Sequence, residues 1–121
     1  SAVVPIDDVV QAWFTLPELA ERLGVPVTAV RRMLEDRELV AVRRGERNVL
    51  CVPAGFLDDA GPLPALKGTF TVLADGGFAD EEIVSWLHTP DASWPGGPTA
   101  LDAIRAGFKT EVRRRAMEEA I

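Results

Sequence analysis

Residues 15 to 52 constrain the fold of this chain more than any other segment, because they predict two short helices joined at a glycine. The first helix begins with a capping box, in which the Thr15 hydroxyl accepts a hydrogen bond from the amide of Glu18 and the Glu18 carboxylate reaches back. Gly24 permits the left-handed conformation that ends such a helix. A second helix follows the next Val-Pro pair and is expected to run to about Asp36.

Two β-prone runs between residues 39 and 52 flank a charged turn that contains Gly45. Their spacing suits a hairpin with about four to five connecting residues. A capped helix, a glycine turn, a second helix and a basic hairpin, in this order, are typical of a winged helix-turn-helix. We therefore predict such a domain over residues 12–57.

A segment rich in Gly, Pro and Asp, residues 54–64, is expected to connect this domain to a C-terminal helical region over residues 64–121. Apolar periodicity and turn residues predict four helices there, the last of them capped by Thr110. Their expected ranges are 66–76, 80–88, 99–107 and 110–121. The predicted fold class is mainly α with a small β-hairpin wing, in which the winged domain packs against the helical region.

The length of 121 residues suits one compact domain, or a small domain and a helical extension that share one core. We expect one cooperative unit. No apolar run approaches the roughly 20 residues of a membrane span, and no signal peptide is recognisable. We therefore expect a cytoplasmic protein without a membrane partner.

Enzyme chemistry finds little support in these residues. Cys51 is the only cysteine and His88 the only histidine, so one chain offers neither a disulfide nor a Cys/His zinc site. We expect Cys51 to be a buried thiol and His88 to interact with the dipole at a helix end. A phosphate-binding Gly-rich loop and a nucleophile elbow are both missing. We predict no catalytic residue, no metal and no cofactor.

The charges of the chain are unevenly distributed. The net charge is −6, yet the segment 22–47 contains seven Arg and four acids, a local excess of +3. Nucleic acids are bound largely through neutralisation of phosphates by Lys and Arg. This polarity lets one face approach DNA while the rest of the chain repels it.

The second predicted helix carries candidate readers of DNA sequence. Its apolar stripe leaves Thr28, Arg31 and Arg32 on or near the outward face. Arg can form two hydrogen bonds with a guanine edge, and Thr can contact a thymine methyl group or a phosphate. These three residues are our predicted major-groove contacts; the alternative is that the arginines only make the helix soluble.

The predicted wing carries three further candidates. Arg43, Arg44 and Arg47 lie around the hairpin turn, where they could straddle a phosphate or enter the adjacent minor groove. With the recognition helix, they complete the predicted DNA-binding set.

The C-terminal region contains a second basic run and a loop with three Pro and two Gly, residues 89–98. We expect the loop to be ordered by packing of Trp94. Arg113, Arg114 and Arg115 have acids at three- and four-residue spacing, which predicts intrahelical pairs. A second DNA contact is the alternative for these arginines.

The pattern LPELAERLGVPVTAVRRMLEDRELVAVRRG resembles the helix-turn-helix modules of the excisionase and MerR-like superfamily. From about residue 14 to residue 121, the chain also resembles actinobacterial winged-helix DNA-binding proteins that are substrates of a membrane Ser/Thr protein kinase. The matching segments are LPALKGTFTVLADGGFADEEIVSWLHTPD and ALDAIRAGFKTEVRRRAMEEA. The resemblance implies binding of double-stranded DNA through the winged half.

The resemblance also implies a Ser/Thr protein kinase as a candidate partner. In that family, phosphorylation of a Thr in a flexible N-terminal tail is thought to weaken DNA binding. The segment 1–11 contains no Thr, so this regulatory feature is not transferred to the present sequence.

Two functions are compatible with these patterns. The first is a DNA-binding protein that acts as a transcriptional regulator or a nucleoid-type binder, with a homodimer as a candidate state because two copies double the phosphate contacts. The alternative is a protein-protein interaction module, antitoxin-like or scaffold-like. The segments DEEIVSWLHTPD and PTALDAIRAG resemble the toxin-binding region of Xre-type antitoxins.

Overall fold

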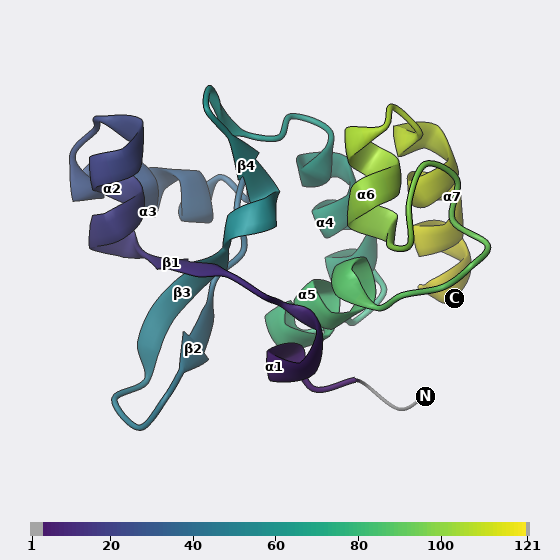
Figure 1. The fold of residues 1–121 in the computed structure, drawn as a ribbon, viewed down its shortest axis with the longest axis horizontal. Helices are drawn as coiled ribbons and strands as arrows, with labels where there is room; N and C mark the ends of the chain where they lie inside the picture. The colour runs from purple at the N-terminus through teal and green to yellow at the C-terminus, as the bar shows by residue number, and fades with distance from the viewer. Residues whose placement is uncertain (1–3, 121) are drawn as a thin grey trace.

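Residues 4–120 are described in a computed structural model, in which a winged helix-turn-helix is followed by a helical region (Figure 1). The predicted fold class is confirmed. Among the described residues, every helix is too short or too polar to cross a membrane.

Helices α2 (Leu16–Leu23) and α3 (Val27–Glu35) form the helix-turn-helix. The predicted capping box is present: the Glu18 amide donates to the Thr15 hydroxyl at 3.3 Å, and the Thr15 amide donates to the Glu18 carboxylate at 2.8 Å. Gly24 ends α2 with a φ of 68°, the left-handed value that glycine adopts without strain. The sequence prediction for both helices is confirmed.

The wing is the hairpin of β2 (Val42–Arg44) and β3 (Val49–Pro53), as predicted. A third strand, β1 (Trp13–Thr15), pairs with the other edge of β3 and gives the sheet order β1-β3-β2. The sequence patterns did not predict β1, because three residues show no usable alternation. Its pairing depends on β3, which lies almost forty residues further along the chain.

The N-terminal segment also has structure that the sequence patterns did not predict. Helix α1 (Ile6–Val9) packs on α5 through its buried Ile6. The Ser85 hydroxyl donates to the carbonyl of Val4 at 2.7 Å and ties this segment to the helical region. The N-terminal segment, which precedes the winged half in the sequence, therefore packs on the helical half.

The connection and the helical region complete the chain. A 3-10 helix, η1 (Ala54–Phe56), leads into a short hairpin of β4 (Leu57–Asp58) and β5 (Gly61–Pro62). Four helices follow, close to the predicted ranges: α4 (Leu66–Asp75), α5 (Asp80–His88), α6 (Ala100–Arg105) and α7 (Lys109–Glu119). The predicted cap at Thr110 is wrong, because α7 begins one residue earlier and its N-cap, Phe108, makes no side-chain cap bond.

A continuous core joins the two halves. Phe56 of η1 and Phe70 of α4 are fully buried, with ring centroids 5.2 Å apart. Arg37, just after α3, pairs with Asp80 of α5 at 3.1 Å. Arg105 of α6 donates to the carbonyl of Leu57 at 3.0 Å. Apolar and polar contacts therefore both cross the boundary between the winged half and the helical half.

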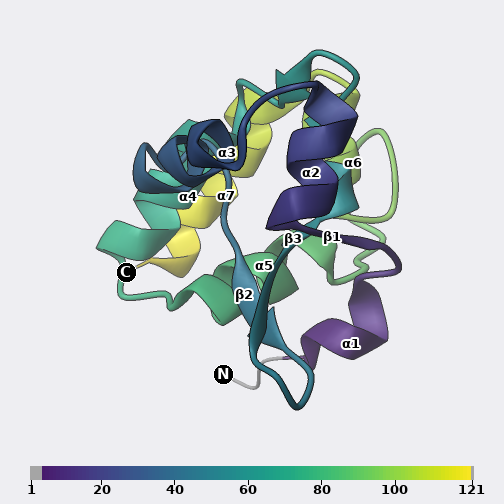
Figure 2. The same cartoon turned by 90° about the vertical axis from the view of Figure 1, so that its left-hand side faces the viewer.

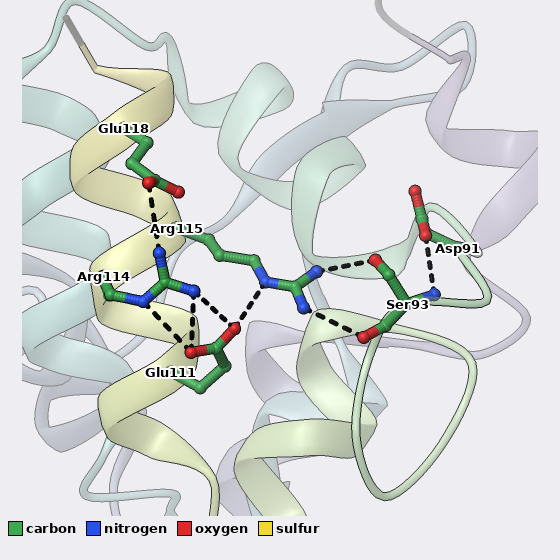
Figure 3. A network of polar contacts seen from close by, with 6 residues as sticks. All are labelled: Asp91, Ser93, Glu111, Arg114, Arg115 and Glu118. Carbon is green, nitrogen blue, oxygen red and sulfur yellow. Dashed lines mark hydrogen bonds and ion pairs between the residues drawn. The ribbon is translucent and has the colours of Figure 1, made fainter.

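The loop 89–98 is held against α7 (Figure 3), and the expected packing of Trp94 is present. Trp94 meets Trp86 edge to face at 5.6 Å, and the Arg115 guanidinium lies 4.1 Å from the Trp94 ring centroid. Arg115 also donates to the hydroxyl and carbonyl of Ser93 at 2.8 and 2.9 Å. This Pro- and Gly-rich loop is thus fixed by one arginine and two indoles.

The predicted intrahelical pairs of the basic run in α7 are confirmed for two of the three arginines (Figure 3). Arg114 pairs with Glu111 at 2.7 Å and with Glu118 at 3.1 Å, and Arg115 pairs with Glu111 at 2.8 Å. Hydrogen bonds from both arginines hold the pKa of Glu111 below its usual range. Most of the positive charge of this run is therefore compensated within the helix.

Candidate nucleic-acid interface

Helix α3 presents its predicted contact residues to solvent. Val30 is fully buried and sets the inward direction of the helix. Thr28, Arg31 and Arg32 are all exposed. Figure 2 shows α2, α3 and the hairpin on the side of the molecule that faces the viewer, and α7 lies at the opposite end in Figure 1.

Three of the seven arginines in the basic segment are paired with acids. Arg22 lies 3.5 Å from Asp59, and Arg37 makes the contact with α5 described above. Arg44 lies 2.7 Å from Asp7 of the N-terminal segment. The positive charge counted along the sequence is therefore only partly available at the surface.

The wing arginines point in different directions. Successive residues of a strand face opposite sides of the sheet, so Arg43 and Arg44 of β2 separate. Arg44 is the side chain that lies over the Trp13 ring, 4.3 Å from its centroid, and that binds Asp7. Arg43 is exposed, and its Nη1 donates to the carbonyl of Asn48 at 2.9 Å.

The structure brings Arg31 and Arg43 together. Both line a hollow of about 270 Å³ between α2, α3 and the hairpin. Arg47 is exposed in the hairpin turn, and Arg44 lies on the other face of the sheet. The six predicted contacts thus do not form a single cluster.

Four exposed arginines of the segment 22–47 make no ion pair with any residue that the structure describes. They are Arg31, Arg32, Arg43 and Arg47. Two come from the recognition helix and two from the wing. The arrangement offers a cationic surface built from both parts of a winged helix-turn-helix.

Asn48 and Asp7 are residues of this region that the sequence patterns missed. Asn48 has a φ of 52°, a left-handed conformation that Asn tolerates better than most residues, and its carbonyl orients Arg43. The position of Asn48 in the turn that begins at Gly45 was the available signal. Asp7 had no signal, because its pairing with Arg44 spans the sequence from α1 to β2.

The shifted pKa values of Glu18 and His88 have local structural causes. The pKa of Glu18 is lowered by its hydrogen bonds with Thr15, in keeping with its cap role. Burial against Phe56 lowers the pKa of His88, whose Nδ1 bonds the Val84 carbonyl at 2.7 Å; the predicted charged interaction with the helix end is therefore not favoured. Within residues 4–120, no group of His, Cys, Asp and Glu is arranged to hold a metal ion.

The fold and this surface define a winged helix-turn-helix protein with a cationic recognition helix and wing. Residues 3–57 match the family model described as "DNA-binding protein Rv2175c, wHTH domain", and residues 63–120 match "Rv2175c C-terminal domain of unknown function". The chain belongs to the Rv2175c family. The resemblance to winged-helix DNA-binding proteins noted from the sequence is confirmed.

A relative and a solved structure support this assignment. The chain is 39% identical over 124 residues to DNA-binding protein Rv2175c of Mycobacterium tuberculosis (strain ATCC 25618 / H37Rv), covering 91% of this chain and 84% of the relative. It is also similar to the NMR structure of Rv2175c, with a TM-score of 0.73 and 36% identity over 92% of this chain and 82% of that one. The likeness extends over both halves.

Proposed function

We propose that this chain binds double-stranded DNA, with α3 in the major groove and the hairpin wing on the neighbouring backbone or minor groove. The observation that carries the proposal is the set of four arginines without an ion pair to a described residue on α3 and the wing. Cations at these two places can neutralise phosphates on both sides of a groove. The relative named above is a DNA-binding protein, which supports the same function here.

We further propose that binding serves transcriptional regulation or nucleoid organisation, and that a homodimer is the active form. One copy offers few unpaired cations, so its affinity for DNA is expected to be modest. A two-fold dimer doubles the phosphate contacts and sets the spacing of half-sites. Sedimentation at micromolar concentration, with and without duplex, measures this state directly.

Fluorescence anisotropy with a mixed-sequence duplex, across about 50 to 200 mM salt, tests the DNA-binding proposal. The test variant combines Arg31→Ala, Arg32→Ala and Arg47→Ala. The matched control combines Lys67→Ala, Lys109→Ala and Arg114→Ala, which removes the same charge from exposed positions of the helical half.

The test variant is expected to lose affinity and to flatten the salt dependence, by at most about 2.7 in log-log slope, the value for three separate phosphate contacts. The control is expected to bind like the wild type. Equal losses in both variants would assign binding to overall charge and not to the winged surface. Absence of binding by a folded wild type at every salt concentration would refute the proposal and favour the protein-protein interaction module.

A further inference from the structure

The hollow shared by α3 and the wing carries a more specific inference. We propose that Arg31 and Arg43 together hold one phosphate of the DNA backbone, so that Arg31 contributes affinity and Thr28 and Arg32 read the bases. This inference rests on the proposed DNA binding and refines it. It changes the role that the sequence alone suggested for Arg31.

The shape of the hollow comes from three elements. The start of α2, the middle of α3 and both strands of the hairpin meet around a volume of about 270 Å³. The lining residues are Leu16, Pro17, Arg31, Arg43, Asn48, Val49 and Leu50. None of these described residues is acidic, so the charge of the hollow is positive.

The two guanidinium groups suit a single anion. Arg43 uses Nη1 for the Asn48 carbonyl at 2.9 Å, which fixes the direction of its planar group. A guanidinium has five N–H donors, so the others stay available for phosphate oxygens. Arg31 lines the same hollow from α3 and makes no ion pair with any described residue. An anion placed there meets one oriented cation and a second cation across the hollow.

The apolar part of the lining indicates which anion fits. Pro17 is exposed, and Leu50, which pairs with Arg43 and so faces the same side of the sheet, is only partly buried. A free inorganic phosphate gains nothing from covering carbon atoms. A phosphodiester is flanked by two deoxyribose rings, whose carbon atoms can cover Pro17 and Leu50 and remove apolar surface from water. The hollow therefore fits a phosphate within a strand.

The geometry of α3 separates Arg31 from the base readers. Residues of an α-helix are rotated by about 100° from one to the next. With Val30 directed into the core, Thr28 and Arg32 point about 20° from the outward direction, and Arg31 points about 80° from it. A helix in the major groove meets bases with its outermost residues and the backbone with its flanks. Arg31 is on the flank that faces the wing.

The test is the salt dependence of DNA affinity for Arg31→Ala, Arg43→Ala and the double variant. Neutralisation of one phosphate contributes about 0.9 to the slope of log affinity against log salt. If both arginines serve one phosphate, the double variant loses about 0.9 in slope, and its affinity loss differs from the product of the two single losses. Two separate phosphates would give a slope loss of about 1.8 and multiplicative effects, which would overturn the inference.

Two comparisons complete the experiment. Arg114→Ala removes the same charge from α7, which lies at the opposite end of the molecule from α3 (Figure 1), and is expected to leave the slope unchanged. On a panel of duplexes of different sequence, Arg31→Ala is expected to lower the affinity for every duplex by the same factor. Arg32→Ala is expected to change the order of the duplexes by affinity. If Arg31→Ala changes that order, the inference is wrong. If the wild type has no sequence preference, the salt slope of the double variant alone distinguishes one shared phosphate from two separate ones.

Far-UV circular dichroism verifies that each variant is folded, and Gln replaces Ala at any position where it is not. A folded wild type that binds no DNA refutes the proposed function itself. Normal wild-type binding with a slope loss near 1.8 refutes only the shared phosphate. The two failures are therefore distinguishable.

Discussion

Phe56→Ala tests whether the winged half and the helical half unfold as one unit. Phe56 is fully buried at the end of η1, and its ring lies 5.2 Å from that of Phe70 in α4. Truncation of a buried Phe to Ala removes apolar burial and leaves a cavity, at a cost of about 3 to 5 kcal/mol. Domains of this size have total stabilities of about 5 to 15 kcal/mol. The substitution should therefore remove about a fifth or more of the stability.

Urea unfolding of single-tryptophan proteins measures the effect in each half separately. One protein retains Trp13, which belongs to β1, and the other retains Trp94, which packs on α7. With a slope of about 1 to 3 kcal/mol per molar urea, the midpoint should fall by on the order of 2 M. Because Phe56 belongs to one core cluster that includes residues of both halves, we expect the two tryptophans to report the same midpoint before and after the substitution.

Different midpoints for Trp13 and Trp94, or a shift seen by one of them alone, would refute a shared core. Met117→Ala serves as the control, since this α7 side chain is 56% exposed and its loss should change stability by less than about 0.5 kcal/mol. Phe56→Leu replaces Phe56→Ala if the latter does not fold in the absence of urea.

The remaining predictions concern a cap, a buried titratable group and a loop. Thr15→Ala should destabilise the protein by about 0.5 to 2 kcal/mol, because it removes the acceptor of the α2 capping box. Thr15→Ser should retain most of the stability. Equal melting temperatures for the wild type and both variants would contradict the cap role. Burial lowers the pKa of His88 in the folded state, so unfolding takes up a proton and stability should fall as the pH drops through 6.5 toward the folded pKa. His88→Asn keeps a donor for the Val84 carbonyl and should flatten that part of the curve in chemical denaturation at pH 5.5 to 8; an unchanged curve would exclude His88 as its source. Arg115→Ala should release loop 89–98 from α7, so that the loop amides exchange hydrogen faster and the emission of Trp94 shifts to the red. Arg114→Ala should leave both the exchange and the emission unchanged. Unchanged exchange in Arg115→Ala would show that the indoles alone hold the loop.

Features that depend on neighbouring residues were determined by the sequence itself. The capping box of Thr15 and the left-handed Gly24 involve atoms within one helical turn, so their residue types were sufficient to place both ends of α2. The hairpin and the arginine-glutamate pairs of α7 are similarly local. Family membership was also recognisable from the sequence, since the matching segments extend over both halves.

The candidate site was predictable in part. The exposure of Thr28, Arg31 and Arg32 followed from the helical period, which is a property of the backbone. The opposite directions of Arg43 and Arg44 follow from the two-residue period of a strand, and the sequence contained that information although the arginines were first treated as one cluster.

Other properties of the site were decided only by the tertiary structure. Strand β1 exists because β3 offers it an edge, Asp7 neutralises Arg44 from a helix more than thirty residues away, and Arg31 shares a hollow with Arg43. Each depends on the register of the sheet and on the packing of distant segments. No local pattern encodes such distances, because the free energy of these contacts is realised only when the whole core forms.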